Sequence, residues 1–189
     1  GYGEYSNTKI RARKFDIVQV ERIMTGKGWA RGNDGIWNKG DLRFSVQLTY
    51  SSDLQTERLV VIKEEAKKAG VEINLDLIDS SALYKKGMEK KFQVIMWAWS
   101  TNTRPEYWQG HHSDNAHKAQ TNNLSNMDNK QLDKLIDKYR FSPSAKEQIE
   151  LSQEIQEIIY DEASFVPFYM IPYARFAGWR WLRLPEVPA

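Results

Sequence analysis

The middle of the chain carries two stretches of alternating apolar and polar residues, separated by a helical pattern. In residues 43–50 every second side chain is apolar, which is the period of a strand with one buried face. Residues 71–77 repeat this alternation. Between them, apolar residues recur at helical spacing from the capping-box motif at Ser52 to Gly70, a residue suited to follow a helix end. The pattern predicts a βαβ unit with parallel strands and a right-handed crossover.

A second helix and a third strand are expected to extend this unit. Residues 80–90 show a weaker helical pattern, and residues 92–99 follow as the strand. Residues 94–99 are continuously apolar, which is typical of a strand covered on both faces. The sequence therefore predicts an α/β fold with a βαβαβ core and a parallel sheet.

Two helices and an edge strand are expected after this core. The first helix includes residues 132–139 and is opened by Asp128. The second is opened by Ser144, and its apolar stripe reaches Ala163. Residues 165–172 form a short apolar run that contains two prolines, which favours a strand at the edge of a sheet.

The domain organisation is expected to be simple. Residues 1–14 are polar and irregular, and we interpret them as a lead-in segment. Residues 15–175 are interpreted as one α/β ligand-binding lobe that begins with a short amphipathic helix over residues 15–25, and residues 176–189 as a truncated tail. The chain lacks an initiator Met and a signal peptide, so we expect a mature protein or a fragment.

Composition and motifs argue against several function classes. The chain has no cysteine, which excludes a disulfide framework, a thiolate zinc site and a cysteine nucleophile. Its 27 basic and 25 acidic residues leave a net charge of +2, too small to indicate a nucleic-acid or anionic-membrane surface. It has no G-x-S-x-G motif, no Walker loop and no G-x-G-x-x-G after a strand. We therefore expect a binding protein without a cofactor rather than an enzyme.

The clearest candidate site lies at the end of the third strand. Residues 100–126 show no periodic pattern, and a loop of this length is often functional. In open α/β sheets, ligands bind beyond the carboxyl ends of the strands. Six residues here offer aromatic faces, an amide or a guanidinium to a ligand: Trp97, Trp99, Asn102, Arg104, Tyr107 and Trp108. The two strand tryptophans share one face and belong either to the core or to a pocket, and Arg104 is either a ligand residue or a surface charge.

The same loop contains a possible metal site. His111, His112 and His117, together with Asp114, are residue types that bind divalent ions. Their spacing is not that of a zinc-protease helix, and ligands on a loop need support from surrounding residues. A solvated loop is therefore the main alternative, and a metallohydrolase remains a competing hypothesis. A carbohydrate-binding module that uses the tryptophans is disfavoured by the βαβαβ pattern.

Residues 15–175 contain a series of different short motifs, each of which occurs once in this range. In chain order they are Phe15-Asp16, Gly28-Trp29, Asn33-Asp34-Gly35, Gly40-Asp41-Leu42, Ala69-Gly70-Val71, Phe92-Gln93-Val94, Asn122-Asn123, Leu132-Asp133-Lys134-Leu135-Ile136 and Pro167-Phe168. In order and spacing, this series resembles family 5 extracellular solute-binding proteins, the peptide- and nickel-binding components of ABC importers. Tyr107-Trp108 and residues 169–172 resemble its YejA-like branch, which includes binding proteins for microcin C and oligopeptides.

The resemblance implies a fold, a function and a location. The fold would be the C-terminal lobe of a periplasmic-binding-protein type II clamshell, with half of the ligand pocket. The function would be to capture peptides or peptide-like solutes and to deliver them to an ABC permease in the membrane, with a nickel or metal-chelate ligand as the alternative. The protein would be periplasmic or otherwise extracytoplasmic, monomeric and without a nucleic-acid partner. We expect the isolated lobe to bind ligand weakly, since enclosure supplies most of the contact.

One position departs from the pattern of the family. In its peptide-binding members, a Trp ends the third strand, and an Asp three residues later holds the α-ammonium of the peptide. Trp99 matches the Trp, but Asn102 stands at the Asp position. An amide accepts a hydrogen bond from an ammonium group but carries no charge. The hydrogen bond is therefore about 1 kcal/mol weaker than one to a carboxylate. We therefore hypothesise a ligand with a blocked or formylated N-terminus, or a ligand that is not a peptide.

Overall fold

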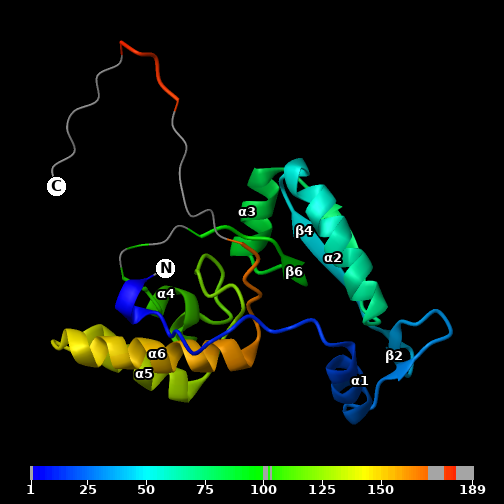
Figure 1. The fold of residues 1–189 in the computed structure, drawn as a ribbon, viewed down its shortest axis with the longest axis horizontal. Coiled ribbons are helices and arrows are strands. Elements are labelled where there is room, and N and C mark those ends of the chain that lie inside the picture. Colours follow the sequence, from blue (N-terminus) through cyan, green and yellow to red (C-terminus); the bar gives the residue numbers. More distant parts are fainter. Residues whose placement is uncertain (1, 100–101, 103, 170–176, 182–189) are drawn as a thin grey trace.

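In the part of the chain that the structure describes, the strands form two small sheets (Figure 1). The computed structural model describes residues 2–99, 102, 104–169 and 177–181. One sheet is antiparallel and contains β1 (Ala30–Arg31), β2 (Trp37–Lys39) and β3 (Leu42–Arg43). The other is parallel, has the order β5-β4-β6 and contains β4 (Ser45–Tyr50), β5 (Glu72–Leu77) and β6 (Val94–Ile95). The parallel sheet confirms the predicted α/β fold.

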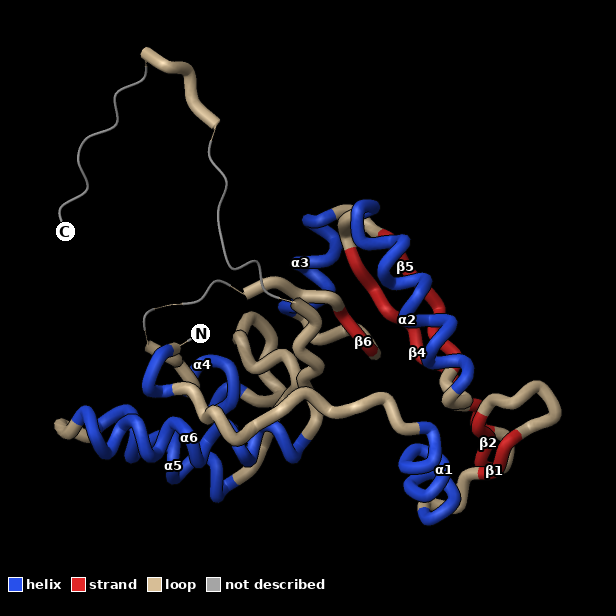
Figure 2. The backbone as a smooth tube through the Cα atoms, viewed as in Figure 1, coloured by secondary structure: helices blue, strands red, loops and turns tan. Residues whose placement is uncertain are grey.

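The predicted βαβ unit is present, with α2 (Thr56–Lys68) as its crossover helix (Figure 2). Tyr50 at the end of β4 and Leu59 on α2 are both buried, and the Tyr50 hydroxyl is 2.9 Å from Thr56 Oγ1. The start of the helix differs from the prediction, because Ser52 precedes a 3-10 turn and its side chain makes no capping bond. The end agrees, since Gly70 follows the helix at a φ of +85°.

The third strand is shorter and more exposed than its apolar sequence predicts. β6 holds two residues, pairs only with β4 and leaves Val94 39% exposed. The prediction of a strand covered on both faces is therefore wrong, because none of residues 94–99 is buried and Val94, Ala98 and Trp99 are exposed. Met96 N still donates to Thr49 O (2.9 Å), and the chain then leaves the sheet. The helix before it, α3 (Ser80–Met88), agrees with the prediction.

A helical half lies beside the sheet and is built on α5 (Lys130–Phe141) and α6 (Ala145–Glu162). Its core contains Leu132, Ile136 and Ile155, which have no exposed surface. Ser144 caps α6 as predicted, because its hydroxyl accepts a hydrogen bond from Glu147 N. α5 is capped one residue later than predicted. Its cap is Asn129, whose side-chain oxygen accepts from two backbone amides of the first turn.

The N-terminal segment and the segment after α6 both run between the halves of the molecule. The N-terminal segment contains η1 (Gly3–Tyr5), runs along α6 and reaches α1 (Ile17–Gly26), which Asp16 caps (Figure 1). Residues 163–169 lead from the end of α6 toward the sheet, where the Tyr169 hydroxyl accepts a hydrogen bond from Gln55. These residues form no strand, which corrects the predicted edge strand for its described part; residues 170–172 lie outside the described residues.

The predicted long loop is also more ordered than expected. It contains α4 (Trp108–His111) and η3 (Ser113–Asn115), and a buried asparagine, Asn123, bonds the backbone of His112 and Met127. Side-chain bonding to the backbone leaves no apolar periodicity, so the sequence pattern could not show this order. Across the described part of the chain, no helix has both the length and the apolar character that crossing a membrane requires.

Candidate functional site

A hollow of about 330 Å³ opens at the carboxyl edge of the parallel sheet. Its lining comes from the segments that follow the three strands, from α3 and from the C-terminal segment: Ser51, Ser52, Gln55, Ser80, Leu83, Tyr84, Met96, Trp97, Ala98 and Tyr169. The parallel register places the ends of β4 and β5 side by side, since Tyr50 pairs with Leu77. This is the edge at which ligands bind in open α/β sheets.

Trp97 is the one sequence-predicted site residue that lines the hollow, and its ring packs against two residues of α3. It stacks on Tyr84 of α3, with ring centroids 5.9 Å apart and an interplanar angle of 26°. A Cβ atom at Gly87 would lie 2.5 Å from Trp97 Cζ3, so only a glycine allows the indole to approach α3 this closely. Trp97 therefore serves both packing and the wall of the hollow.

Tyr169 forms another wall of the hollow and comes from a distant part of the sequence. Its hydroxyl accepts a hydrogen bond from Gln55 Nε2 at 2.9 Å. The Arg58 guanidinium lies 5.1 Å from the centre of the Tyr169 ring, a cation–π contact from α2. These two contacts tie the C-terminal segment to the helix that covers the sheet.

Trp99, Asn102 and Arg104 are not among the residues that line the hollow. Trp99 is 47% exposed and its ring centroid is 6.1 Å from that of Trp97. Asn102 is exposed. Arg104 is also exposed, is 5.9 Å from the Tyr5 ring and donates to Gln148 at 3.4 Å, so it faces the helical half.

Tyr107 and Trp108 pack in the helical half and do not line the hollow. Tyr107 is buried, and its hydroxyl lies 2.7 Å from Ser152 Oγ and accepts from Gln156. Burial raises the pKa of the Tyr107 hydroxyl above its usual value. The half-buried Trp108 lies under the Arg140 guanidinium at 4.8 Å. The structure thus separates these two residues from Trp97 and gives them contacts that stabilise the fold.

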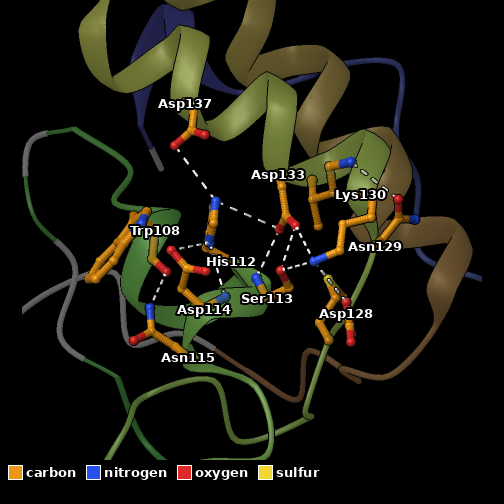
Figure 3. Close-up of polar contacts among 12 residues, drawn as sticks. Trp108, His112, Ser113, Asp114, Asn115, Asp128, Asn129, Lys130, Asp133 and Asp137 are labelled. Atoms are coloured by element: carbon orange, nitrogen blue, oxygen red, sulfur yellow. Dashed lines mark hydrogen bonds and ion pairs between the residues drawn. The ribbon is translucent and has the colours of Figure 1, made fainter.

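His112 is engaged in contacts with its neighbours in the fold (Figure 3). His112 is buried, and its Nδ1 accepts a hydrogen bond from Asp114 N at 3.1 Å. In a neutral imidazole the proton then sits on Nε2, which points toward Asp137 Oδ1 at 3.6 Å. Neither nitrogen is free to bind a metal in this tautomer. In the part of the chain that the structure describes, no three His, Asp or Glu side chains are placed to hold a metal ion.

The other two histidines have different surroundings. Burial without a hydrogen bond to Nδ1 lowers the pKa of His111 to about 4, so its imidazole is neutral at pH 7. His117 is exposed, with a backbone φ of +55°. Asp133, whose Oδ1 lies 3.8 Å from His112 Nε2, accepts hydrogen bonds from Ser113 N and Ser113 Oγ (Figure 3). These contacts fasten η3 to α5.

Sequence reasoning identified the position of the hollow but missed most of its lining. The serines, Gln55 and Tyr84 stand at strand ends or on helices and carry no motif. The available signal was their place in the predicted topology, because Ser51 and Ser80 follow successive parallel strands closely. Tyr169 had no such signal, since it is 114 residues away from its partner Gln55.

Comparison with known proteins finds sequence relatives that are named as peptide-binding proteins. No family model matches the chain. The oligopeptide-binding protein AppA of Bacillus subtilis is 25% identical over 165 residues, which cover 85% of this chain and 30% of AppA. The probable peptide-binding protein YejA of Agrobacterium fabrum is 20% identical over 180 residues, which cover 92% of this chain and 29% of YejA. The chain thus spans about 30% of the length of these curated relatives.

Solved structures give the same fold. AppA in complex with a nonapeptide matches with a TM-score of 0.74 and 24% identity, over 85% of this chain and 33% of AppA. NikZ of Campylobacter jejuni in complex with Ni(L-His) matches with a TM-score of 0.74 and 15% identity, over 84% of this chain and 33% of NikZ. The predicted lobe fold is confirmed: the chain has the periplasmic-binding-protein fold of the oligopeptide-binding proteins, over about a third of their length.

Proposed function

We propose that this chain is part of the substrate-binding component of an ABC importer that captures peptides or peptide-like solutes. The observation that carries the proposal is the aromatic-walled hollow at the carboxyl edge of the sheet, in a fold shared with a nonapeptide-bound relative. The side-chain hydroxyls of Ser51, Ser52 and Ser80 offer donors and acceptors to a peptide backbone beside the aromatic rings.

Ligand binding would close the two lobes around the ligand and would not involve a catalysed reaction. In a two-lobed protein, ligand contacts with both lobes favour the closed arrangement and shift the population toward it. A permease in the membrane would then recognise the closed form. The chain would work outside the cytoplasm and would perform no catalysis. The YejA-like branch remains part of this proposal, because the sequence comparison matches both YejA and AppA.

Asn102 bears on which peptide is bound. It is exposed and therefore open to a ligand group. Because its amide has no charge, it gives a free α-ammonium less stabilisation than a carboxylate would. We propose that a ligand with a blocked or formylated N-terminus suits this position as well as a free peptide does.

A nickel or metal-chelate ligand is the second candidate, favoured by the structural match to NikZ. The histidine geometry speaks against it, since Nδ1 of His112 already accepts a backbone hydrogen bond and His111 is buried. A chelate held through other groups would not depend on these residues.

Native mass spectrometry of the full gene product, purified without refolding, tests the proposal. A heterogeneous set of bound peptide masses is the expected result. One stoichiometric metal ion, or a single compact mass that is not a peptide, would overturn the peptide assignment and favour the second candidate. Measurable turnover of a peptide by the purified protein would contradict the absence of catalysis.

A further inference from the structure

We propose that the hollow is a subsite for one uncharged aromatic or apolar side chain of the bound ligand. This inference rests on the proposed function, because it names the kind of residue that the peptide would present there. The lining is made of serine, glutamine, alanine, leucine, methionine, tyrosine and tryptophan side chains, all without charge at neutral pH. The volume of about 330 Å³ is at the lower end for ligand pockets, so it suits a part of a peptide rather than a whole one.

Three charged residues on the neighbouring segments are engaged within the fold. Arg58 lies over the Tyr169 ring and donates to Gln55 Oε1 at 3.4 Å. Asp79 caps α3 by accepting from Ser81 N and Ala82 N. Lys86 pairs with Asp76 at 3.1 Å. A charged guest would therefore lose hydration in the hollow without gaining an ionic partner from its lining, which disfavours it.

The aromatic side chains of the lining favour an aromatic or apolar guest. Trp97 and Tyr84 lie nearly parallel and form a continuous wall, and Tyr169 contributes a third ring. Aromatic faces stack on planar groups and offer a large apolar area. Leu83 and Met96 add apolar surface between the rings and the sheet. A planar aromatic guest gains both stacking and burial here, and an aliphatic guest gains burial alone.

Gly87 acts as a positioning residue for this wall. Any Cβ atom at position 87 would lie 2.5 Å from Trp97 Cζ3 and 3.0 Å from Trp97 Cη2. Gly87→Ala would therefore push the indole away from α3 and change the shape of the hollow. The affected ring belongs to the proposed subsite, so the variant should change selectivity between guests more than it changes binding of the peptide backbone.

A positional scan of short peptides tests the inference with the full gene product. Each peptide carries one guest residue (Phe, Leu, Lys or Glu) at one position of a constant alanine background, and calorimetry measures each dissociation constant. At one position, Phe and Leu should bind about tenfold or more tightly than Lys and Glu. At that position Gly87→Ala should reduce the preference for Phe over Leu.

A matched pair of charge variants makes the test specific. Ser80 lines the hollow and Ser81 does not, although both are exposed residues in the first turn of α3. An acidic residue is compatible with either position of a helix N-terminus. Ser80→Asp should therefore convert the preference at the sensitive position from Phe toward Lys, and Ser81→Asp should leave it unchanged.

The outcomes separate the inference from the function on which it rests. If peptides bind but every position accepts Lys and Glu as well as Phe, the subsite is refuted and the peptide-binding function stands. The same holds if both aspartate variants behave alike. If no peptide in the scan binds, the proposed function itself is contradicted, and the subsite falls with it.

Discussion

Replacing Gly70 by alanine should destabilise the fold strongly, because two separate costs meet at this residue. Its φ is +85°, a conformation that costs a residue with a Cβ atom about 1–2 kcal/mol. The added Cβ atom would also lie 2.6 Å from both Cδ1 and Nε1 of Trp37 and 3.0 Å from Gly35 O. Overpacking of a well-packed core adds about 1–3 kcal/mol. We therefore expect Gly70→Ala to lower the free energy of unfolding by about 2–5 kcal/mol.

Trp37 has little freedom to move away from the new atom. Its side chain is 2% exposed, its Nε1 donates to Ala69 O at 2.8 Å, and its backbone N donates to Gly70 O at 3.0 Å. A shift of the indole would break the first of these bonds. The steric part of the cost therefore cannot be relieved by a simple rotation of the ring.

Urea denaturation followed by tryptophan fluorescence measures the effect, and Gly40→Ala is the matched control. Gly40 also has a positive φ (+58°), but no atom lies within 4 Å of its added Cβ. The control should lose only the conformational part, about 1–2 kcal/mol. Equal losses in the two variants would refute the claim that contact with Trp37 contributes, and a loss below 1 kcal/mol for Gly70→Ala would refute the whole argument.

Three further predictions concern titration, a buried hydroxyl and ligand charge. Because the folded-state pKa of His111 is about 4 and the unfolded value is about 6.5, the unfolded chain takes up the proton first, and stability falls as pH drops from 6.5 to 4. Between pH 7.5 and 5 this one group should cost about 2 kcal/mol, a loss that urea denaturation should find missing in His111→Gln. Tyr107→Phe should cost about 1–3 kcal/mol in the same assay, because Ser152 and Gln156 lose a buried partner; an unchanged midpoint would contradict this. Asn102→Asp should tighten binding of peptides with a free N-terminus about fivefold by calorimetry and leave N-acetylated peptides unaffected; equal effects on both would remove Asn102 from the site.

The sequence predicted those parts of the fold in which apolar residues recur with a regular period. The alternation in residues 43–50 and 71–77 produced β4 and β5, because one face of each strand packs against α2 or α3. It failed at β6, where residues 94–99 are all apolar although only Val94 and Ile95 pair with a neighbour. The remaining apolar residues make side-chain contacts at the edge of the sheet, such as that of Trp97 with Tyr84. Such contacts do not recur at a regular spacing in the sequence. Ser80 meets Ser51 and Ser52 at the hollow only through the register of the parallel strands, and no local sequence pattern indicates that.

The aromatic cluster of residues 97–108 shows most clearly where local reasoning ends. Closeness in sequence suggested one ligand-facing surface, yet the chain leaves the sheet after Met96 and enters the helical half at Pro105, whose carbonyl accepts a hydrogen bond from Tyr139. Trp97 therefore packs on α3, and Tyr107 packs between α5 and α6. The position of each ring follows from the element that it contacts rather than from its neighbours in sequence. A ligand at the sheet edge would thus meet Trp97 together with Tyr84 and Tyr169, which come from segments that the sequence keeps far apart.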